Sequence, residues 1–473
     1  MPDDGAVLRR TAFAVTLLGL LALVVAWPVT SLWLLPRLAL VVLVVAGVVV
    51  GLRSVWRRDI QDPRDVRGGA WRERVRGRRR LPTTVWLVAA AVTVLLVAAT
   101  AVVQVGSRPT VGDFYTPPDD VPAEAGRLVA SEPLDAGSAD LEGWRMLYTT
   151  VDASGVPVVA SAAVVAPREV AGPLPVVTVG HGTSGIRPEC APSATGEAYG
   201  GLRAALEPVA VSGAVGVAPD YVGLGVESPD GVHAYLDGPS EASALLDATR
   251  AADELVATTG EVVLWGHSQG GHAALWAATS AATYAPDLEV LGVAAMAPAT
   301  DLPGIVEDVS STAVGRVLAS YLVESWDALH PDLDVRADEG WFEGRAIDRM
   351  AARCLLGRDA AAAVAAGSQL TEDVLSPTQA RTGVTGELLA AQVPTAATDA
   401  PVVVAQGADD ALVSAARQRA WVEQRCAAGE SPGYVEYADR DHNSLTDAGS
   451  PLVDDLVAWT AARVAGEPFE GVC

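Results

Sequence analysis

Lysine is missing from this chain of 473 residues, since all 33 of its basic side chains are arginine. Cysteine, methionine and phenylalanine occur four times each, and histidine only six times. Histidine, cysteine and aspartate do not cluster at the spacing of metal ligands, so we expect no bound metal and no cofactor. The 58 acidic residues outnumber the basic ones and give a net charge of −25. Because nucleic acid is a polyanion, this excess of negative charge argues against a nucleic-acid partner.

Charge and hydropathy divide the chain into two parts. Residues 1–106 have a net charge of +8, whereas residues 107–473 have a net charge of −33. The first part contains three long apolar runs, at 11–29, 32–52 and 84–105, each close to the ~20 residues that cross a bilayer as a helix. A cleavable signal peptide is an alternative for the first run, but it does not explain the other two. We therefore predict a membrane region with three transmembrane helices.

The loop between the second and third apolar runs sets the expected orientation. Residues 53–82 hold 11 arginines against four acidic residues, which favours the cytoplasmic side. Three crossings then leave everything after the third run outside. All four cysteines lie in that outer part, and an even number of cysteines suits an oxidising compartment. We therefore expect a multi-pass protein of the cell membrane whose larger domain is extracytoplasmic.

The second part of the chain predicts a tether followed by an α/β domain. Residues 107–142 are rich in Pro, Asp and Gly and predict the tether. From 143 to 473, apolar runs alternate with helical patterns, which predicts a mostly parallel sheet with helices on both faces. A hairpin at 144–151 and 157–166 should open the domain. The remaining strands are expected at 174–179, 214–218, 262–265, 290–296, 401–405 and 434–437, and two of the helices at 240–258 and 451–464. The long stretch before the last two strands has no strand pattern, so we predict a helical lid at about 302–395.

One short stretch carries the strongest functional signal. The sequence Gly-His-Ser-Gln-Gly at 266–270 matches G-x-S-x-G, the nucleophile elbow of α/β-hydrolases. Small residues are needed at both ends because the turn from strand to helix is so tight that side chains there would clash. Such a turn exposes the Ser268 hydroxyl and leaves the Gln269 N–H free to bind an oxyanion. A chance match is the alternative, but the apolar run before the motif and the helical run after it argue against chance.

A serine nucleophile needs a base and an acid that orients the base. In this fold the chain order is Ser, then Asp or Glu, then His. His442 is the last of the six histidines and the only one after residue 330, so it is the candidate base. Asp409 and Asp410 compete for the role of the acid. The spacing Gly-x-x-Asp-x-x-Val at 407–413 favours Asp410 and leaves Asp409 as a solvated turn residue.

A second oxyanion donor is expected after the strand at 174–179. Thr183 follows His181 and Gly182 in a glycine-rich turn and could supply this N–H. An ordinary turn at the end of a strand is the alternative. We expect the other histidines to be structural: His267 should pack beside the strand, and His272 should face out of the first helical turn. A place in the pocket wall is left open for His233.

These motifs together resemble the secretory lipases, a family of the α/β-hydrolase superfamily typified by yeast lipases of the lipase A type. The resemblance covers about 130–473 and rests on five short segments, at 181–185, 218–225, 266–271, 407–410 and 441–443. It implies an α/β-hydrolase core, a helical lid and ester substrates such as triacylglycerols. The three predicted membrane spans depart from the secreted form of that family.

The motifs favour a membrane-anchored, extracytoplasmic hydrolase of carboxylic esters, either a lipase or an esterase. Its substrate would be a lipid or another acyl ester. A peptidase related to prolyl oligopeptidase is an alternative, but the chain has no repeat typical of a β-propeller. A hydrolase fold without catalytic activity that serves as a surface binding module is a second alternative. The presence of all three candidate catalytic residues argues against it.

The four cysteines allow three pairings, of which we predict Cys190–Cys354 and Cys426–Cys473. Cys190 follows the turn that carries Thr183, and Cys354 lies in the predicted lid, which should cover the same site. The other two cysteines end the helix after the acid-bearing loop and the chain itself. Resemblance to the secretory lipases also favours the first bridge. Four free thiols are the alternative.

Overall fold

A computed structural model describes residues 110–473, apart from 197–198, 334, 337–339 and 448. The three predicted membrane spans therefore lie outside the described residues. Within the described part, no helix is both long and apolar enough to cross a bilayer.

The centre of the described part is a mixed sheet. Its strands, in chain order, are β1 Leu128–Leu134, β2 Leu141–Val151, β3 Pro157–Pro167, β4 Leu174–Gly180, β5 Val215–Pro219, β6 Thr258–His267, β7 Glu289–Met296, β8 Val402–Gly407 and β9 Gly433–Tyr437. Their order across the sheet is β1-β2-β3-β5-β4-β6-β7-β8-β9. Neighbours are antiparallel from β1 to β5 and parallel from β5 to β9. The central parallel strands are buried apolar runs, as expected for a sheet that is covered on both faces.

The predicted hairpin is confirmed. Strands β2 and β3 pair from Leu141↔Pro167 to Val151↔Pro157. The turn between them is held by Asp152, whose Oδ1 accepts hydrogen bonds of 2.9 Å from the N–H groups of Ser154 and Val156. An Asx turn of this kind shapes the connection and so fixes the register of the two strands.

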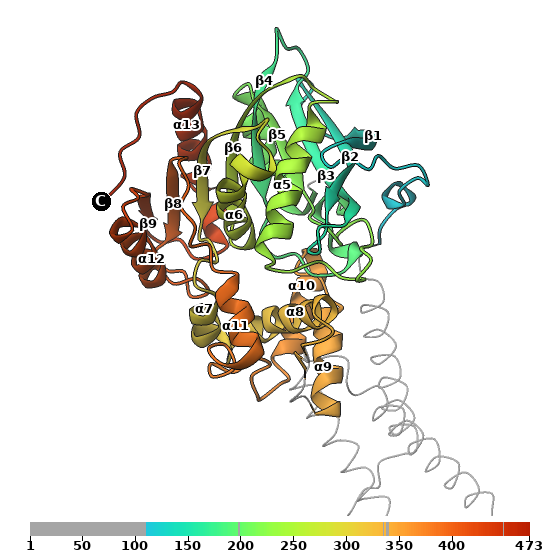
Figure 1. Ribbon diagram of the computed structural model, residues 1–473, viewed down its shortest axis with the longest axis vertical. Helices are drawn as coiled ribbons and strands as arrows, with labels where there is room; N and C mark the ends of the chain where they lie inside the picture. The colour runs from blue at the N-terminus through green and yellow to red at the C-terminus, as the bar shows by residue number, and fades with distance from the viewer. Residues whose placement is uncertain (1–109, 197–198, 334, 337–339, 448) are drawn as a thin grey trace, which may run out of the picture. The chain divides into compact units, whose positions relative to one another are not determined.

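Helices cover both faces of the sheet (Figure 1). One face packs against α5 Gly238–Ala252, α6 Gln269–Tyr284 and α12 Ala415–Ala427, and the other against α4 Arg203–Val211 and α13 Leu452–Val464. Helix α5 ends six residues earlier than the predicted 258. The Asp253 carboxylate stops it by accepting hydrogen bonds of 2.8 Å from the N–H and hydroxyl of Thr258, where β6 begins. Short 3₁₀ helices complete the described part of the chain: η2 Asp113–Tyr115, η3 Pro188–Cys190, η4 Pro192–Ala194, η5 Tyr199–Gly201 and η6 Ser444–Thr446.

Strand β1 corrects the predicted tether at 107–142. The strand lies within that range and pairs with β2 at the edge of the sheet. An edge strand tolerates proline and half-exposed polar residues, here Pro133 and Glu132, because one of its sides makes no ladder. Its sequence therefore lacks the apolar run that reveals a central strand.

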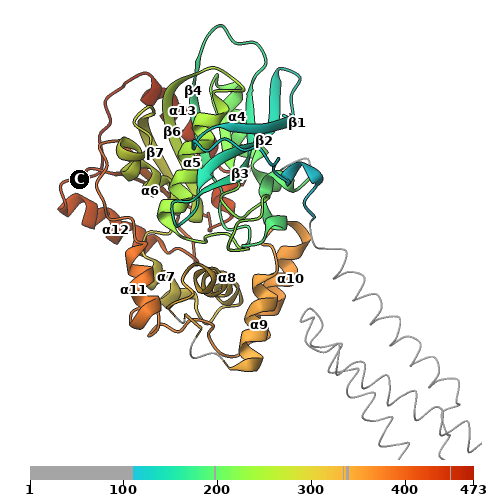
Figure 2. The same cartoon turned by 45° about the vertical axis from the view of Figure 1, so that its right-hand side comes forward.

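Between β7 and β8 the chain forms a helical insertion, as the sequence predicts. Its helices are α7 Leu302–Val309, α8 Ala313–Leu329, α9 Trp341–Ala351, α10 Gly357–Gly367 and α11 Gly383–Ala391. Figures 1 and 2 both show these helices gathered at one end of the sheet. The insertion has a hydrophobic cluster of its own, which also includes Ile186, Tyr235 and Leu236 from loops outside the insertion.

Both predicted disulfides are present. One joins Cys190 to Cys354, and the other joins Cys426 to Cys473. The first bridge connects the segment after β4 to the loop between α9 and α10. Beside it, Leu355 donates a backbone hydrogen bond of 2.7 Å to Ser184. The base of the insertion is therefore fixed to the loop that follows β4.

Candidate active site

Ser268 stands at the tight turn between β6 and α6. Its backbone has φ 56° and ψ −115°, a conformation that a non-glycine residue keeps only when its surroundings hold it. Glycines on either side make the turn possible. A Cβ on Gly266 would overlap the carbonyl of Gly270, and a Cβ on Gly270 would overlap the carbonyl of Gly180. The backbone of Ser268 is also held by a 2.8 Å hydrogen bond from its N–H to Met296.

The loops after β8 and β9 bring a histidine and an aspartate to this serine. His442 Nε2 lies 2.9 Å from Ser268 Oγ, and His442 Nδ1 lies 2.8 Å from Asp410 Oδ2. As residues, His442 and Asp410 are buried, whereas the neighbouring Asp409 is exposed. The structure thus brings together the three residues selected from the sequence and leaves Asp409 in a turn.

Asp410 is held as a hydrogen-bond acceptor. Its Oδ1 accepts from the N–H groups of Leu412 and Val413, both at 2.8 Å. Its Oδ2 accepts from Gln406 Nε2 at 3.1 Å as well as from His442. Burial alone would raise the pKa of Asp410, but these hydrogen bonds outweigh burial and hold the pKa below its usual range. An ionised Asp410 requires a proton on Nδ1 of His442, which leaves Nε2 free to accept from Ser268.

The two candidate oxyanion donors lie beside the serine. Gln269 is the first residue of α6, so its N–H has no partner within the helix. The loop that carries Thr183 runs close to the serine, since a Cβ on Gly182 would lie 3.6 Å from the Ser268 Cβ. Among the described residues, neither the Gln269 N–H nor the Thr183 N–H has a hydrogen-bond partner. The Thr183 hydroxyl lies 2.9 Å from the Tyr235 hydroxyl.

Two of the other histidines have the structural roles expected of them. His267 packs against His442, with 4.7 Å between the ring centroids. Burial, with His442 nearby, lowers the pKa of His267 to about 3. Both ring nitrogens of His181 face backbone carbonyls, at 2.7 Å and 3.3 Å, and burial lowers its pKa to about 4. Both rings therefore stay neutral near pH 7.

The expectation that His272 faces outward is wrong. Its side chain is fully buried, and its Nδ1 lies 2.9 Å from the carboxylate of Glu241 on α5. The small residues of α6 let neighbouring elements cover the start of the helix on every side, and the helix is buried from Gln269 to Leu275. Glu241 itself carries no signal in the sequence, because an acidic residue in the first turn is common in surface helices.

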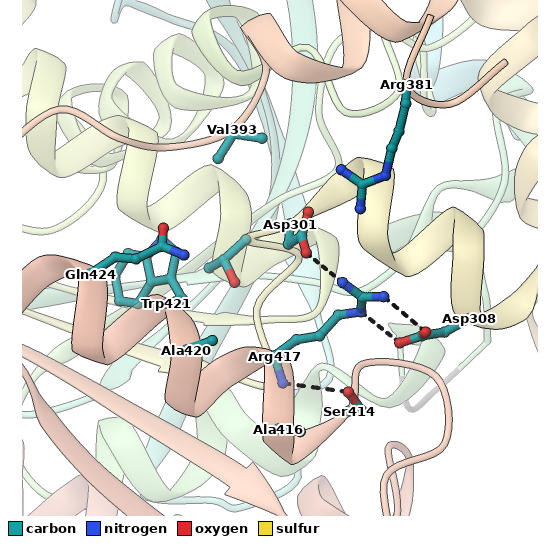
Figure 3. Close-up of a pocket in the computed structure, with 11 residues that line it drawn as sticks. Asp301, Asp308, Arg381, Val393, Ser414, Ala416, Arg417, Ala420, Trp421 and Gln424 are labelled. Atoms are coloured by element: carbon teal, nitrogen blue, oxygen red, sulfur yellow. Dashed lines mark hydrogen bonds and ion pairs between the residues drawn. The ribbon is translucent and has the colours of Figure 1, made fainter. Parts of the chain in front are cut away.

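A separate concavity of about 550 Å³ lies between the start of the insertion and α12. Figure 3 shows Arg417 in it, with dashed lines to Asp301 and Asp308. Neither Ser268, nor His442, nor Asp410 lines this pocket, so its position is not that of the candidate active site. In the described part of the chain, no group of three or more His, Cys, Asp or Glu side chains could hold a metal ion.

Sequence comparison identifies the family of this chain. The model of the secretory lipase family matches residues 203–471. The chain belongs to the secretory lipase family. It is 27% identical over 222 residues to a probable inactive lipase of Mycobacterium tuberculosis, and this alignment covers 44% of this chain and 46% of the relative. It is also 27% identical over 239 residues to Lipase A of Moesziomyces aphidis, which covers 47% of this chain and 50% of the relative. The chain thus spans about half the length of the curated relatives it matches.

Solved structures show the same fold. The crystal structure of Candida antarctica lipase A superimposes with a TM-score of 0.64 at 20% identity, over 76% of this chain and 87% of that chain. The rice cell wall degrading esterase LipA of Xanthomonas oryzae has a TM-score of 0.54 at 20% identity, over 73% of this chain and 98% of that chain. At such identities the likeness establishes the α/β-hydrolase fold.

Proposed function

We propose that this member of the secretory lipase family is a carboxylic ester hydrolase with Ser268 as its nucleophile. The observation that carries the proposal is the continuous chain of hydrogen bonds from Ser268 through His442 to Asp410, at a strained strand-to-helix turn. Nucleophile, base and orienting acid within hydrogen-bond reach are the signature of covalent catalysis by serine.

In the proposed reaction, Ser268 Oγ attacks the ester carbonyl carbon while His442 Nε2 takes the hydroxyl proton. The carbonyl oxygen becomes an oxyanion and accepts hydrogen bonds from the N–H groups of Gln269 and Thr183. His442 then gives its proton to the departing alkoxide, and the acyl-enzyme remains. Water repeats the two steps on the acyl-enzyme and releases the carboxylic acid. Throughout, the ionised Asp410 holds the proton-bearing Nδ1 of the ring.

Ester turnover by the full chain tests the proposal. It should be measured first, because one relative of the chain is named as a probable inactive lipase. The purified protein should release p-nitrophenol from p-nitrophenyl esters, and Ser268→Ala should lower that rate by about a thousandfold or more. An aminoacyl p-nitroanilide is the control substrate and should stay intact. Turnover of the anilide alone would favour the peptidase alternative, and turnover of neither substrate would contradict an enzyme.

The substrate class we propose is a lipid or another acyl ester. Family membership supports it, as does the helical insertion at the same end of the sheet as Ser268. Comparing p-nitrophenyl esters from short to long acyl chains separates a lipase from an esterase.

We also propose that the hydrolase domain works on the extracytoplasmic side, anchored by the apolar runs before residue 107. Two disulfides in the described domain support an oxidising compartment. Protease added to spheroplasts should digest the domain after 107 and spare the arginine-rich loop at 53–82. Cleavage inside that loop from outside would contradict the three-span topology.

A further inference from the structure

A buried carboxylate lies directly behind the proposed oxyanion site. Glu241, in the first turn of α5, has no exposed surface. Its Oε1 accepts hydrogen bonds of 2.7 Å from Gln269 Nε2 and 3.0 Å from the Leu236 N–H. Its Oε2 lies 2.9 Å from His272 Nδ1. Both oxygens of the carboxylate are therefore occupied.

His272 is a further hydrogen-bond partner of this carboxylate. Its Nδ1 faces Glu241, and its Nε2 lies 2.7 Å from the backbone carbonyl of Gln392, at the end of α11. Trp276 Nε1 also lies 3.1 Å from His272 Nε2 and donates to it, so the ring donates to Glu241 through Nδ1 and the two side chains form a buried hydrogen-bonded pair. Burial raises the pKa of Glu241, while the hydrogen bonds from His272 and Gln269 oppose that shift. Removing one partner of such a pair would leave the other without its hydrogen bond in the core.

The pair holds the side chain of Gln269 at a defined point. Gln269 Nε2 donates to Glu241 and also to His233 Nε2, at 2.8 Å. His233 can accept because its Nδ1 donates to the carbonyl of Val222 at 2.8 Å, and because burial lowers its pKa to about 3. The whole of Gln269 is 1% exposed. The side chain of the proposed oxyanion residue is thus fixed from behind by its hydrogen bonds to Glu241 and His233.

We propose that Glu241, hydrogen-bonded to His272, is a positioning residue that aims the backbone N–H of Gln269 at the reacting carbonyl. This inference rests on the proposed ester hydrolysis. The peptide between Ser268 and Gln269 follows a residue with φ 56°, and a strained turn keeps its orientation only if both of its ends are held. The Gln269 side chain holds one end. A small rotation of that peptide would move the N–H away from the oxyanion, and small errors of position in such sites cost up to about a hundredfold in rate.

The test compares two variants of the same helix. In Glu241→Gln the new amide presents an N–H₂ group to either Gln269 or His272, both of which donate. The matched control is Asp247→Asn, also a buried carboxylate on α5. Asp247 accepts from Thr150 Oγ1 at 2.8 Å and from the Tyr284 hydroxyl at 2.6 Å, and Tyr284 ends α6, far along the helix from Ser268. Both substitutions should lower the thermal stability of the full chain.

Kinetics on p-nitrophenyl butyrate, with active sites counted by fluorophosphonate titration, separate positioning from folding. Glu241→Gln should lower kcat per titrated site by about 10- to 100-fold, with KM within about twofold of the wild type. Asp247→Asn should keep the kcat per site of the wild type. Equal kcat per site in the two variants would overturn the inference.

Gln269→Ala provides a second route, in case Glu241→Gln yields no titratable protein. This variant keeps the backbone N–H but loses the anchor, so it should show a similar loss of kcat per site. A wild-type kcat in Gln269→Ala would overturn the inference while leaving the proposed function intact. A wild type without ester turnover that depends on Ser268 would overturn the proposed function first, and the inference with it.

Discussion

His267 donates a hydrogen bond of 2.9 Å from its Nε2 to the backbone carbonyl of His442. The residue before the proposed nucleophile therefore supports the segment that carries the proposed base. His442 lies in a loop between β9 and η6, where no ladder or helix holds its backbone. The hydrogen bond from His267, at the end of β6, holds the backbone of this loop instead.

Replacing His267 by Phe should lower kcat per titrated site about tenfold. Phe keeps an aromatic ring against His442 but loses the donor, so the loop is freed and the Nε2 to Oγ distance of 2.9 Å is no longer fixed. Steady-state kinetics on p-nitrophenyl butyrate with fluorophosphonate titration measure the change. A variant with the kcat of the wild type would show that the loop holds His442 without this contact.

The buried His233 should make the protein sensitive to acid. Its pKa is lowered from 6.5 to about 3 in the folded protein because burial disfavours the charged ring. Below pH 6.5 the unfolded chain therefore binds a proton that the folded chain does not. As far as this group is concerned, the free energy of unfolding is highest above pH 6.5 and decreases as the pH falls. The loss at pH 5 is about 2 kcal/mol for this one group.

His233→Gln isolates the effect of that histidine from those of other titrating groups. Gln cannot take up a proton, so the free energy of unfolding of the variant should fall between pH 7 and pH 5 by about 2 kcal/mol less than that of the wild type. Urea unfolding at the two pH values measures both falls. Equal falls in variant and wild type would contradict a lowered pKa for His233.

Asp410→Asn should damage catalysis far more than Asp409→Asn. The new amide N–H₂ group of Asn would face groups that now donate hydrogen bonds to Asp410, and it would favour the wrong tautomer of His442. We expect a loss of about 10³- to 10⁴-fold in kcat. Asp409 is exposed, so its substitution should leave kcat within about twofold. Measuring kcat for both variants decides between the two aspartates. A larger loss in Asp409→Asn would contradict the assignment of the acid.

The sequence predicts those parts of the site that depend on local chemistry and chain order. Ser268 stands in a Gly-x-Ser-x-Gly turn that follows a strand and precedes a helix, unlike the second match at 429–433, and His442 has no competitor late in the chain. Asp410 is selected over its neighbour by the spacing of the turn alone. These three positions follow from short motifs, and the family's chain order connects them.

The parts that depend on packing between helices could not be predicted. Glu241 and His272 meet because α5 and α6 pack closely, and neither residue differs in its local sequence from a surface residue. Helical periodicity suggests an outward-facing His272, since it does not reveal that α6 is covered on every side near its start. Strand β1 is missed for the opposite reason, because its edge position leaves it half-exposed and without an apolar run.

The two disulfides should differ in their effect on activity. The Cys190–Cys354 bridge closes 164 residues and the Cys426–Cys473 bridge closes 47, so loop entropy gives up to about 5 and about 4 kcal/mol of stability. Replacing both cysteines of either bridge by Ala should therefore lower the thermal midpoint of the full chain. Only the first bridge holds the loop after β4, where Thr183 lies, so only its loss should lower kcat/KM per titrated site, by about tenfold. The Cys426→Ala, Cys473→Ala pair is the matched control. An equal activity in both double variants would show that the loop carrying Thr183 keeps its place without the bridge to the insertion.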